Sequence, residues 1–133
     1  MHRSVWADLG TFANLRYAHD LDFFLRAISF NKRMVILENP LLHYRTHATN
    51  TINEGVLKVK LEWAAVVAYY AWKMKRNDWS YWEQLVEITN RHDLTRMLFF
   101  FFKYYQQNVT ERLAVDDWLA DKAFCKFLTD TIR

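Results

Sequence analysis

Two titratable side chains, His19 and Asp20, stand next to each other at the start of a helix predicted over residues 17–30. Free backbone N–H groups and the positive end of the helix dipole favour the ionised form of a carboxylate at this position. Such a carboxylate has two well-known uses. It can cap the helix, or it can act as a general base that takes a proton from a nearby hydroxyl group. On the helix alone the cap is the commoner use, so other parts of the sequence have to decide.

The helix has a predicted inner face and a predicted outer face. Its apolar residues recur at helical spacing and should face a core; they are Leu21, Phe24, Leu25 and Ile28. Asp22 and Arg26 are four residues apart with the acid first, which is the favourable order for an ion pair on a helix surface. We therefore expect Asp22 and Arg26 to point outward.

Three short segments of the N-terminal region share a pattern with a known enzyme family. Residues 3–12 read Arg-Ser-Val-Trp-Ala-Asp-Leu-Gly-Thr-Phe, residues 19–26 read His-Asp-Leu-Asp-Phe-Phe-Leu-Arg, and residues 42–51 read Leu-His-Tyr-Arg-Thr-His-Ala-Thr-Asn-Thr. In this order and spacing, residues 3–51 resemble the C-terminal part of the catalytic domain of family 2 glycosyltransferases, which have a GT-A fold. The matching features are a short helix with Gly-x-Phe, an acidic-pair helix ending in Leu-Arg, and a Tyr-Arg-x-His-x-x-Asn-Thr segment.

The resemblance implies a site and a reaction. Asp20 would be the catalytic base that deprotonates the acceptor hydroxyl as a sugar is transferred with inversion, and His19 would be its neighbour. Arg45 and His47 would lie near the nucleotide diphosphate or its metal, and Arg26 would also bind substrate. The implied partners are a nucleotide-sugar donor, a glycan or lipid-linked acceptor, and a divalent metal, Mg²⁺ or Mn²⁺. The implied process is cell-surface polysaccharide or glycan synthesis.

Residue chemistry leaves alternatives open for these side chains. His43 and His47 have no acidic or thiol partner close in sequence, so they are a poor set of metal ligands. Arg45 suits a phosphate group but could equally pair with Glu38. The literal Asp-x-Asp at residues 20–22 does not follow an apolar strand, and residues two apart on a helix point in different directions. It is therefore not the metal-binding motif of the family.

The nucleotide-binding half of the family has no counterpart in these residues. We therefore expect the chain to be part of a longer transferase and to be inactive alone. The competing hypothesis is a non-catalytic helical interaction module that keeps a transferase-like segment only as scaffold.

Composition predicts a folded, mainly helical protein. Of the 133 residues, 52% are hydrophobic and 17% aromatic, which excludes a disordered chain, and two glycines with one proline argue against a sheet-rich fold. The net charge of +3 comes from scattered basic residues, so nucleic-acid binding is not expected. The single cysteine, Cys125, cannot form an internal disulfide. We predict a mainly α (α+β) chain that consists of the C-terminal part of a GT-A catalytic domain and a helical bundle.

The predicted boundary lies between residues 53 and 54. Residues 1–53 would form the GT-A segment, with Gly10 as the left-handed end of a short helix and one β-hairpin from residues 34–37 and 41–45. Residues 54–133 would form a helical extension. Its predicted helices run from 56 to 75, from 79 to about 91, from 94 to 107 with residues 99–102 buried nearly all round, and from 110 to 132.

The lengths of the apolar runs indicate whether the chain can span a membrane. The longest, residues 64–72 and 97–102, are far shorter than the roughly 20 residues that a bilayer span needs. We expect a cytoplasmic protein. The cluster Lys73-Met74-Lys75-Arg76 leaves peripheral contact with the inner face of the cell membrane open, although a solvated helix end explains three basic residues better. Strand edges left exposed at the hairpin would favour self-association.

Overall fold

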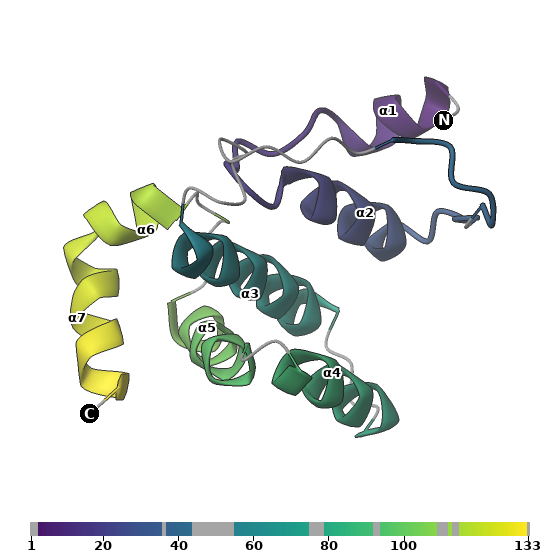
Figure 1. The fold of residues 1–133 in the computed structure, drawn as a ribbon. Coiled ribbons are helices and arrows are strands. Elements are labelled where there is room, and N and C mark those ends of the chain that lie inside the picture. Colours follow the sequence, from purple (N-terminus) through teal and green to yellow (C-terminus); the bar gives the residue numbers. More distant parts are fainter. Residues whose placement is uncertain are drawn as a thin grey trace.

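The computed structural model describes residues 3–35, 37–43, 55–74, 79–91, 94–108, 112 and 115–132. These residues form α-helices joined by loops and turns, so the expected mainly helical class is confirmed. The helices are α1 (Arg3–Leu9), α2 (His19–Ser29), α3 (Val56–Lys73), α4 (Trp79–Arg91), α5 (Thr95–Asn108), α6 (Val115–Ala120) and α7 (Lys122–Ile132). In Figure 1, α3 crosses the middle of the molecule with α1 and α2 above it and α4 and α5 below it.

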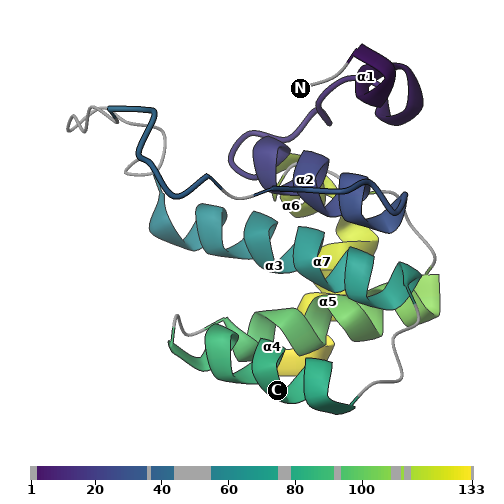
Figure 2. The same ribbon diagram turned by 90° about the vertical axis from the view of Figure 1, so that its right-hand side faces the viewer.

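The main core lies where α3 packs on α5, the most extensive helix contact in the described part of the chain. Small side chains on α3 let α5 and α6 with their aromatic rings approach closely, and α7 packs on α5 and α6. The buried cluster consists of Ala64, Ala65, Ala68, Leu98, Phe100, Phe101, Tyr104, Tyr105, Trp118 and Phe124. The rings of Trp118 and Phe124 have centroids 4.8 Å apart. Figure 2 shows α3 and α5 side by side, with α7 behind them.

The C-terminal part forms two helices, so the single helix predicted over 110–132 is wrong. Helix α6 ends at Ala120 and α7 begins at Lys122. The side chain of Asp121 between them accepts hydrogen bonds from the backbone N–H groups of Ala123 (2.8 Å) and Phe124 (3.3 Å). These are the bonds of a helix N-cap, and they start a new helix at this residue.

The predicted β-hairpin is not seen in the described residues 34–35 and 37–43, none of which lies in a strand. The apolar side chains of this segment are exposed; Val35 is 72% and Leu42 is 79% exposed. A two-stranded hairpin is marginal in water without further strands or a helix to pack against. In Figure 1 the segment bows outward to the right of α1 and α2. Residues 44 and 45 of the predicted second strand lie outside the described part.

The buried face of α2 differs from the predicted one. Its buried residues are Asp22, Phe23 and Ala27. Of the predicted inner residues, Leu21 and Leu25 are partly buried, whereas Phe24 and Ile28 are 50% and 37% exposed. The reason is that α2 is covered by α1 on one side and by α3 on another. Two neighbours turn the helix so that Phe23 and Ala27 pack against α1, and its apolar spacing alone does not show this.

Candidate functional site

His19 and Asp20 occupy the first turn of α2, and both are exposed. The residue at the cap position is Ala18, so the interpretation of Asp20 as the N-cap is wrong. The backbone N–H of Leu21 donates to Oδ1 of Asp20 at 2.7 Å. Asp20 therefore presents its carboxylate to solvent from the first turn, where the helix dipole favours negative charge.

An aromatic cluster borders His19. The imidazole ring contacts the Phe12 ring edge-on, with centroids 5.7 Å apart. Phe12 also contacts Trp6 at 5.6 Å and the buried Phe23 at 4.9 Å. Trp6 and Phe12 are each about half-exposed. The start of α2 therefore lies beside the half-exposed rings of Trp6 and Phe12, and Phe12 packs on the buried ring of Phe23.

The loop before α2 wraps around a carboxylate that comes from α3. Glu62 is fully buried. Its Oε2 accepts the backbone N–H groups of Tyr17 and Ala18, the latter at 2.9 Å, and its Oε1 accepts the N–H groups of Arg16 and Val115 at 3.2 Å each. A buried carboxylate needs such donors, because without them its lost hydration would not be replaced. Glu62 thus joins the start of α2 to α3 and to the start of α6.

A second fully buried carboxylate, Asp22, holds α2 from inside. Its Oδ2 accepts a hydrogen bond from Arg26 at 2.8 Å, and its Oδ1 accepts one from the Tyr70 hydroxyl at 3.1 Å and pairs with Arg112. Arg112 also donates to the Tyr70 oxygen at 2.7 Å. The predicted Asp22–Arg26 ion pair is confirmed, but its expected outward position is wrong. The pair is inside because Arg112 and Tyr70 supply the partners that a buried carboxylate requires.

The contacts of Arg26 lie within the protein. One terminal nitrogen binds Asp22, and the other donates to the carbonyl of Leu9, the last residue of α1, at 2.7 Å. The guanidinium also lies over the Phe23 ring. Through these contacts Arg26 fixes α1 against α2. We therefore do not retain Arg26 as a substrate-binding residue.

Burial changes the acid–base properties of this cluster. Loss of hydration lowers the pKa of the Arg112 guanidinium. The same cause raises the pKa of the Tyr70 hydroxyl well above its ordinary value of 10.0. Tyr70 is therefore neutral at physiological pH and acts as a hydrogen-bond donor to Asp22.

The remaining predicted site residues come after α2 in the sequence. Arg45 and His47 lie outside the described residues, and His43 is exposed in the segment after α2. Within the described residues, no group of three or more His, Cys, Asp or Glu side chains could hold a metal ion. Asp22 is already paired with two guanidinium groups. The described residues near Asp20 therefore do not fit a divalent-metal site.

Sequence reasoning missed Glu62, Tyr70 and Arg112. The sequence does contain a signal for Glu62: it lies three and four residues before Ala65 and Val66, and so shares the inner face of α3 with them. An acid on the apolar face of a helix requires a buried partner. That its partners are main-chain groups before α2 and at α6 cannot be inferred from helical spacing.

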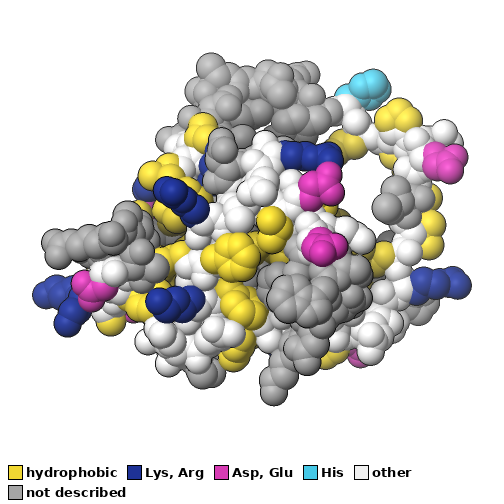
Figure 3. All heavy atoms as spheres, turned by 90° about the horizontal axis from the view of Figure 1, so that it is seen from below, with side chains coloured by type: hydrophobic (Ala, Val, Ile, Leu, Met, Phe, Trp, Pro, Cys, Tyr) yellow, Lys and Arg dark blue, Asp and Glu magenta, His cyan; other side chains and the backbone are white. Residues whose placement is uncertain are grey.

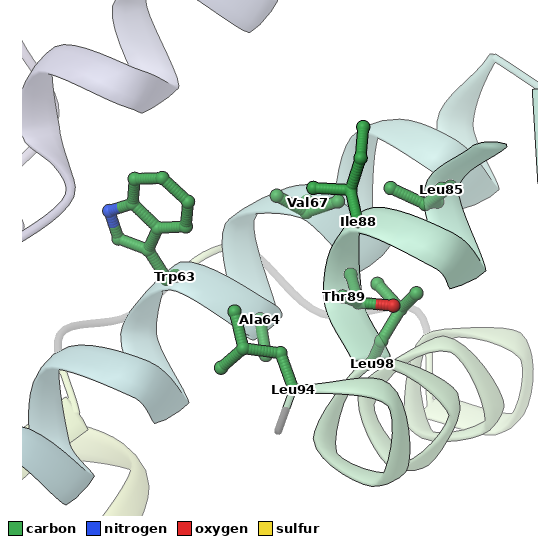
Figure 4. Close-up of a pocket in the computed structure, with 8 residues that line it drawn as sticks. All are labelled: Trp63, Ala64, Val67, Leu85, Ile88, Thr89, Leu94 and Leu98. Atoms are coloured by element: carbon green, nitrogen blue, oxygen red, sulfur yellow. The ribbon is translucent and has the colours of Figure 1, made fainter. Parts of the chain in front are cut away.

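A cavity of about 70 Å³ lies on another side of α3 (Figure 4). It is lined by residues of α3, α4 and α5 and of the turn before α5: Trp63, Ala64, Val67, Leu85, Ile88, Thr89, Leu94 and Leu98. The hydroxyl of Thr89 bonds to the Val86 carbonyl and to Thr95. The view from below also shows apolar side chains at the surface among charged ones (Figure 3). None of these described lining residues carries a group for acid–base chemistry.

No family model, curated protein or solved structure matches this chain. None of the helices that the structure describes is long and apolar enough to cross a membrane. The residues at the start of α2, together with the sequence pattern that contains them, are therefore the basis for a functional proposal.

Proposed function

We propose that this chain is the acceptor-side part of an inverting, family 2 type glycosyltransferase of glycan or cell-surface polysaccharide synthesis. It would act within a longer protein on a nucleotide-sugar donor and a glycan or lipid-linked acceptor. The observation that carries the proposal is the position of Asp20, an exposed carboxylate on the first turn of a helix that buried partners hold in place. A general base needs this combination of access and fixed position.

In the proposed reaction Asp20 takes the proton of the acceptor hydroxyl. The acceptor oxygen then attacks the anomeric carbon of the donor sugar, and the nucleotide diphosphate leaves from the opposite face. The Leu21 amide donates a hydrogen bond to Oδ1 of Asp20. We assign the proton transfer to Oδ2. His19 and the adjacent Phe12 would border the acceptor.

The donor side of the reaction is assigned to residues outside the described part. Arg45 and His47 are the proposed contacts for the diphosphate and its divalent metal. The metal would stabilise the charge of the leaving diphosphate.

The test uses the longest reading frame that contains this chain. The purified protein is assayed for sugar-nucleotide hydrolysis and transfer with and without Mg²⁺ or Mn²⁺. Asp20→Asn should keep the fold and lower turnover by at least about 100-fold, the usual scale for losing a general base. Asp117→Asn, at an exposed acid of α6, is the matched control and should leave turnover unchanged. Full turnover of the Asp20→Asn protein would remove Asp20 from the mechanism.

A second candidate function is a non-catalytic helical interaction module. The aromatic core built on α3, α5, α6 and α7 favours it, because this cluster contains no residue of α1 or α2. Light scattering of the isolated chain separates the two proposals. Self-association through exposed apolar residues such as Val35 and Leu42 is expected of a part of a larger catalytic domain. A monomer, together with no sugar-nucleotide turnover by the longer protein, would favour the module.

A further inference from the structure

The contacts of Glu62 give α3 a role at the candidate site. We propose that Glu62 is a positioning residue: it fixes the backbone of residues 16–18 and, through them, the first turn of α2 that carries His19 and Asp20. The role in catalysis rests on the proposed function. The role in positioning rests on the contacts alone.

The geometry around Glu62 is specific to one backbone shape. Three consecutive N–H groups, those of Arg16, Tyr17 and Ala18, point to the same carboxylate. Ala18 is also the residue at the N-cap position of α2. Successive N–H groups that converge on one anion require a curved main chain. The position of Glu62 therefore sets the direction in which α2 begins.

Both carboxylate oxygens of Glu62 are needed to hold this backbone shape. Oε1 and Oε2 each accept two N–H groups, and Val115 provides the fourth. A glutamine would keep one acceptor oxygen and would turn an amide N–H₂ toward two other donors. An aspartate would keep both acceptors but would end one methylene short. Glu62→Gln is therefore the disruptive variant, and Glu62→Asp is the conservative one.

A separate cluster limits the damage that loss of Glu62 can do. Asp22 in the first turn of α2, together with Arg26, Arg112 and Tyr70, holds the helix against α1 and α3 without using Glu62. Without Glu62, α2 should stay docked while residues 16–18 loosen. The expected effect is thus local to the turn that carries the base.

The contacts of Glu62 also connect the candidate site to the region that follows the transferase-like motifs. Glu62 belongs to α3, and its fourth donor belongs to the first residue of α6. Neither residue lies within residues 3–51, which carry the resemblance. The helical extension is then part of the support of the active-site turn, and it does more than follow the catalytic segment in sequence.

Amide hydrogen exchange on the full 133-residue chain tests the positioning role directly. In Glu62→Gln, exchange at residues 16–18 and at Val115 should be at least about tenfold faster, while the α3 and α5 core amides stay protected. Glu62→Asp should accelerate exchange at the same residues, by a smaller factor. Glu83→Gln, at an exposed acid of α4, is the control and should change nothing there. Unchanged exchange at residues 16–18, or uniform loss of protection in both Glu62 variants, would overturn the proposal.

Steady-state kinetics on the longer protein tests the link to the base. Glu62→Gln should lower kcat by at least about tenfold and leave KM for the nucleotide sugar within about twofold, because only the base is displaced. Glu62→Asp should recover part of kcat. A rise in KM at constant kcat would contradict the proposal. Asp20→Asn is measured in parallel: if it retains full transfer, the proposed reaction fails, and the exchange experiment still decides whether Glu62 holds the turn.

Discussion

The core around α5 and the attachment of α2 are built from different interactions. The α5 core consists of aromatic and small apolar side chains, with ring contacts such as that between Phe101 and Trp118. The start of α2 is held by Asp22 and Glu62, both fully buried in the described structure. Apolar burial stabilises a fold without specifying direction, whereas hydrogen bonds to a buried carboxylate depend on angle and distance. The comparison indicates that one region supplies stability and the other supplies a defined orientation.

The largest expected effect is loss of apolar burial in the α5 core. Phe101→Ala should lower the free energy of unfolding by about 3–5 kcal/mol, because it leaves a cavity among packed rings. Phe99 lies two residues earlier on α5 and is 51% exposed, so Phe99→Ala should cost less than about 1 kcal/mol. Urea unfolding followed by circular dichroism measures both variants. Equal losses would show that the two faces of α5 do not differ as described.

The next effect concerns the two acids in the first turn of α2. Asp22→Asn should lower the free energy of unfolding by about 3 kcal/mol, because it leaves Arg26 and Arg112 without their buried anion. Asp20→Asn should change it by no more than about 0.5 kcal/mol, since Asp20 is exposed. Thermal unfolding of both variants under the same conditions makes the comparison. A larger loss from Asp20→Asn would reverse our assignment of the structural and the exposed acid.

The smallest effect concerns the exposed ion pair between α3 and α6. A hydrogen bond of 2.6 Å joins Lys58 to Asp116; it raises the pKa of Lys58 and lowers that of Asp116. The ion pair should contribute fully to the free energy of unfolding between pH 3.8 and pH 10.5, the ordinary pKa values of Asp116 and Lys58. It should be lost as pH falls through the lowered pKa of Asp116 or rises through the raised pKa of Lys58.

Unfolding of wild type and Lys58→Met across this pH range, at low and high salt, measures the contribution. Salt should reduce the difference, because both side chains are exposed. If the difference in unfolding free energy between wild type and Lys58→Met grew at the pH extremes, the Lys58–Asp116 ion pair would not be its source.

Several helix boundaries could be predicted because local residues determine them. Gly10 has a φ of +71°, as expected of a left-handed helix end. Helix α4 starts at Trp79, as predicted, and α3 starts at Val56. The break at Asp121 also has a local cause, and attention to that single capping residue would have divided the last helix correctly.

Features that depend on distant parts of the chain could not be predicted. The run of residues 99–102 is apolar, but Phe99 faces outward because α5 has its core contacts on the side of Phe100 and Phe101. Asp22 and Arg26 show the spacing of a surface pair, and only contacts with Tyr70 and Arg112, 48 residues and more away, explain their burial. At the candidate site His19 and Asp20 are exposed, whereas Asp22 in the same first turn is buried. Their roles in sugar transfer stay predictions.

The order in which a ribosome makes the chain gives the Glu62 contacts a further consequence. Glu62 is 44 to 46 residues from its partners before α2 and 53 residues from Val115. During synthesis, residues 16–18 emerge before Glu62 and cannot adopt their final geometry until Glu62 follows, and the fourth donor appears later still. The turn that bears His19 and Asp20 is therefore translated before the residues that shape it, and it can mature only after α3 and the start of α6 have been made.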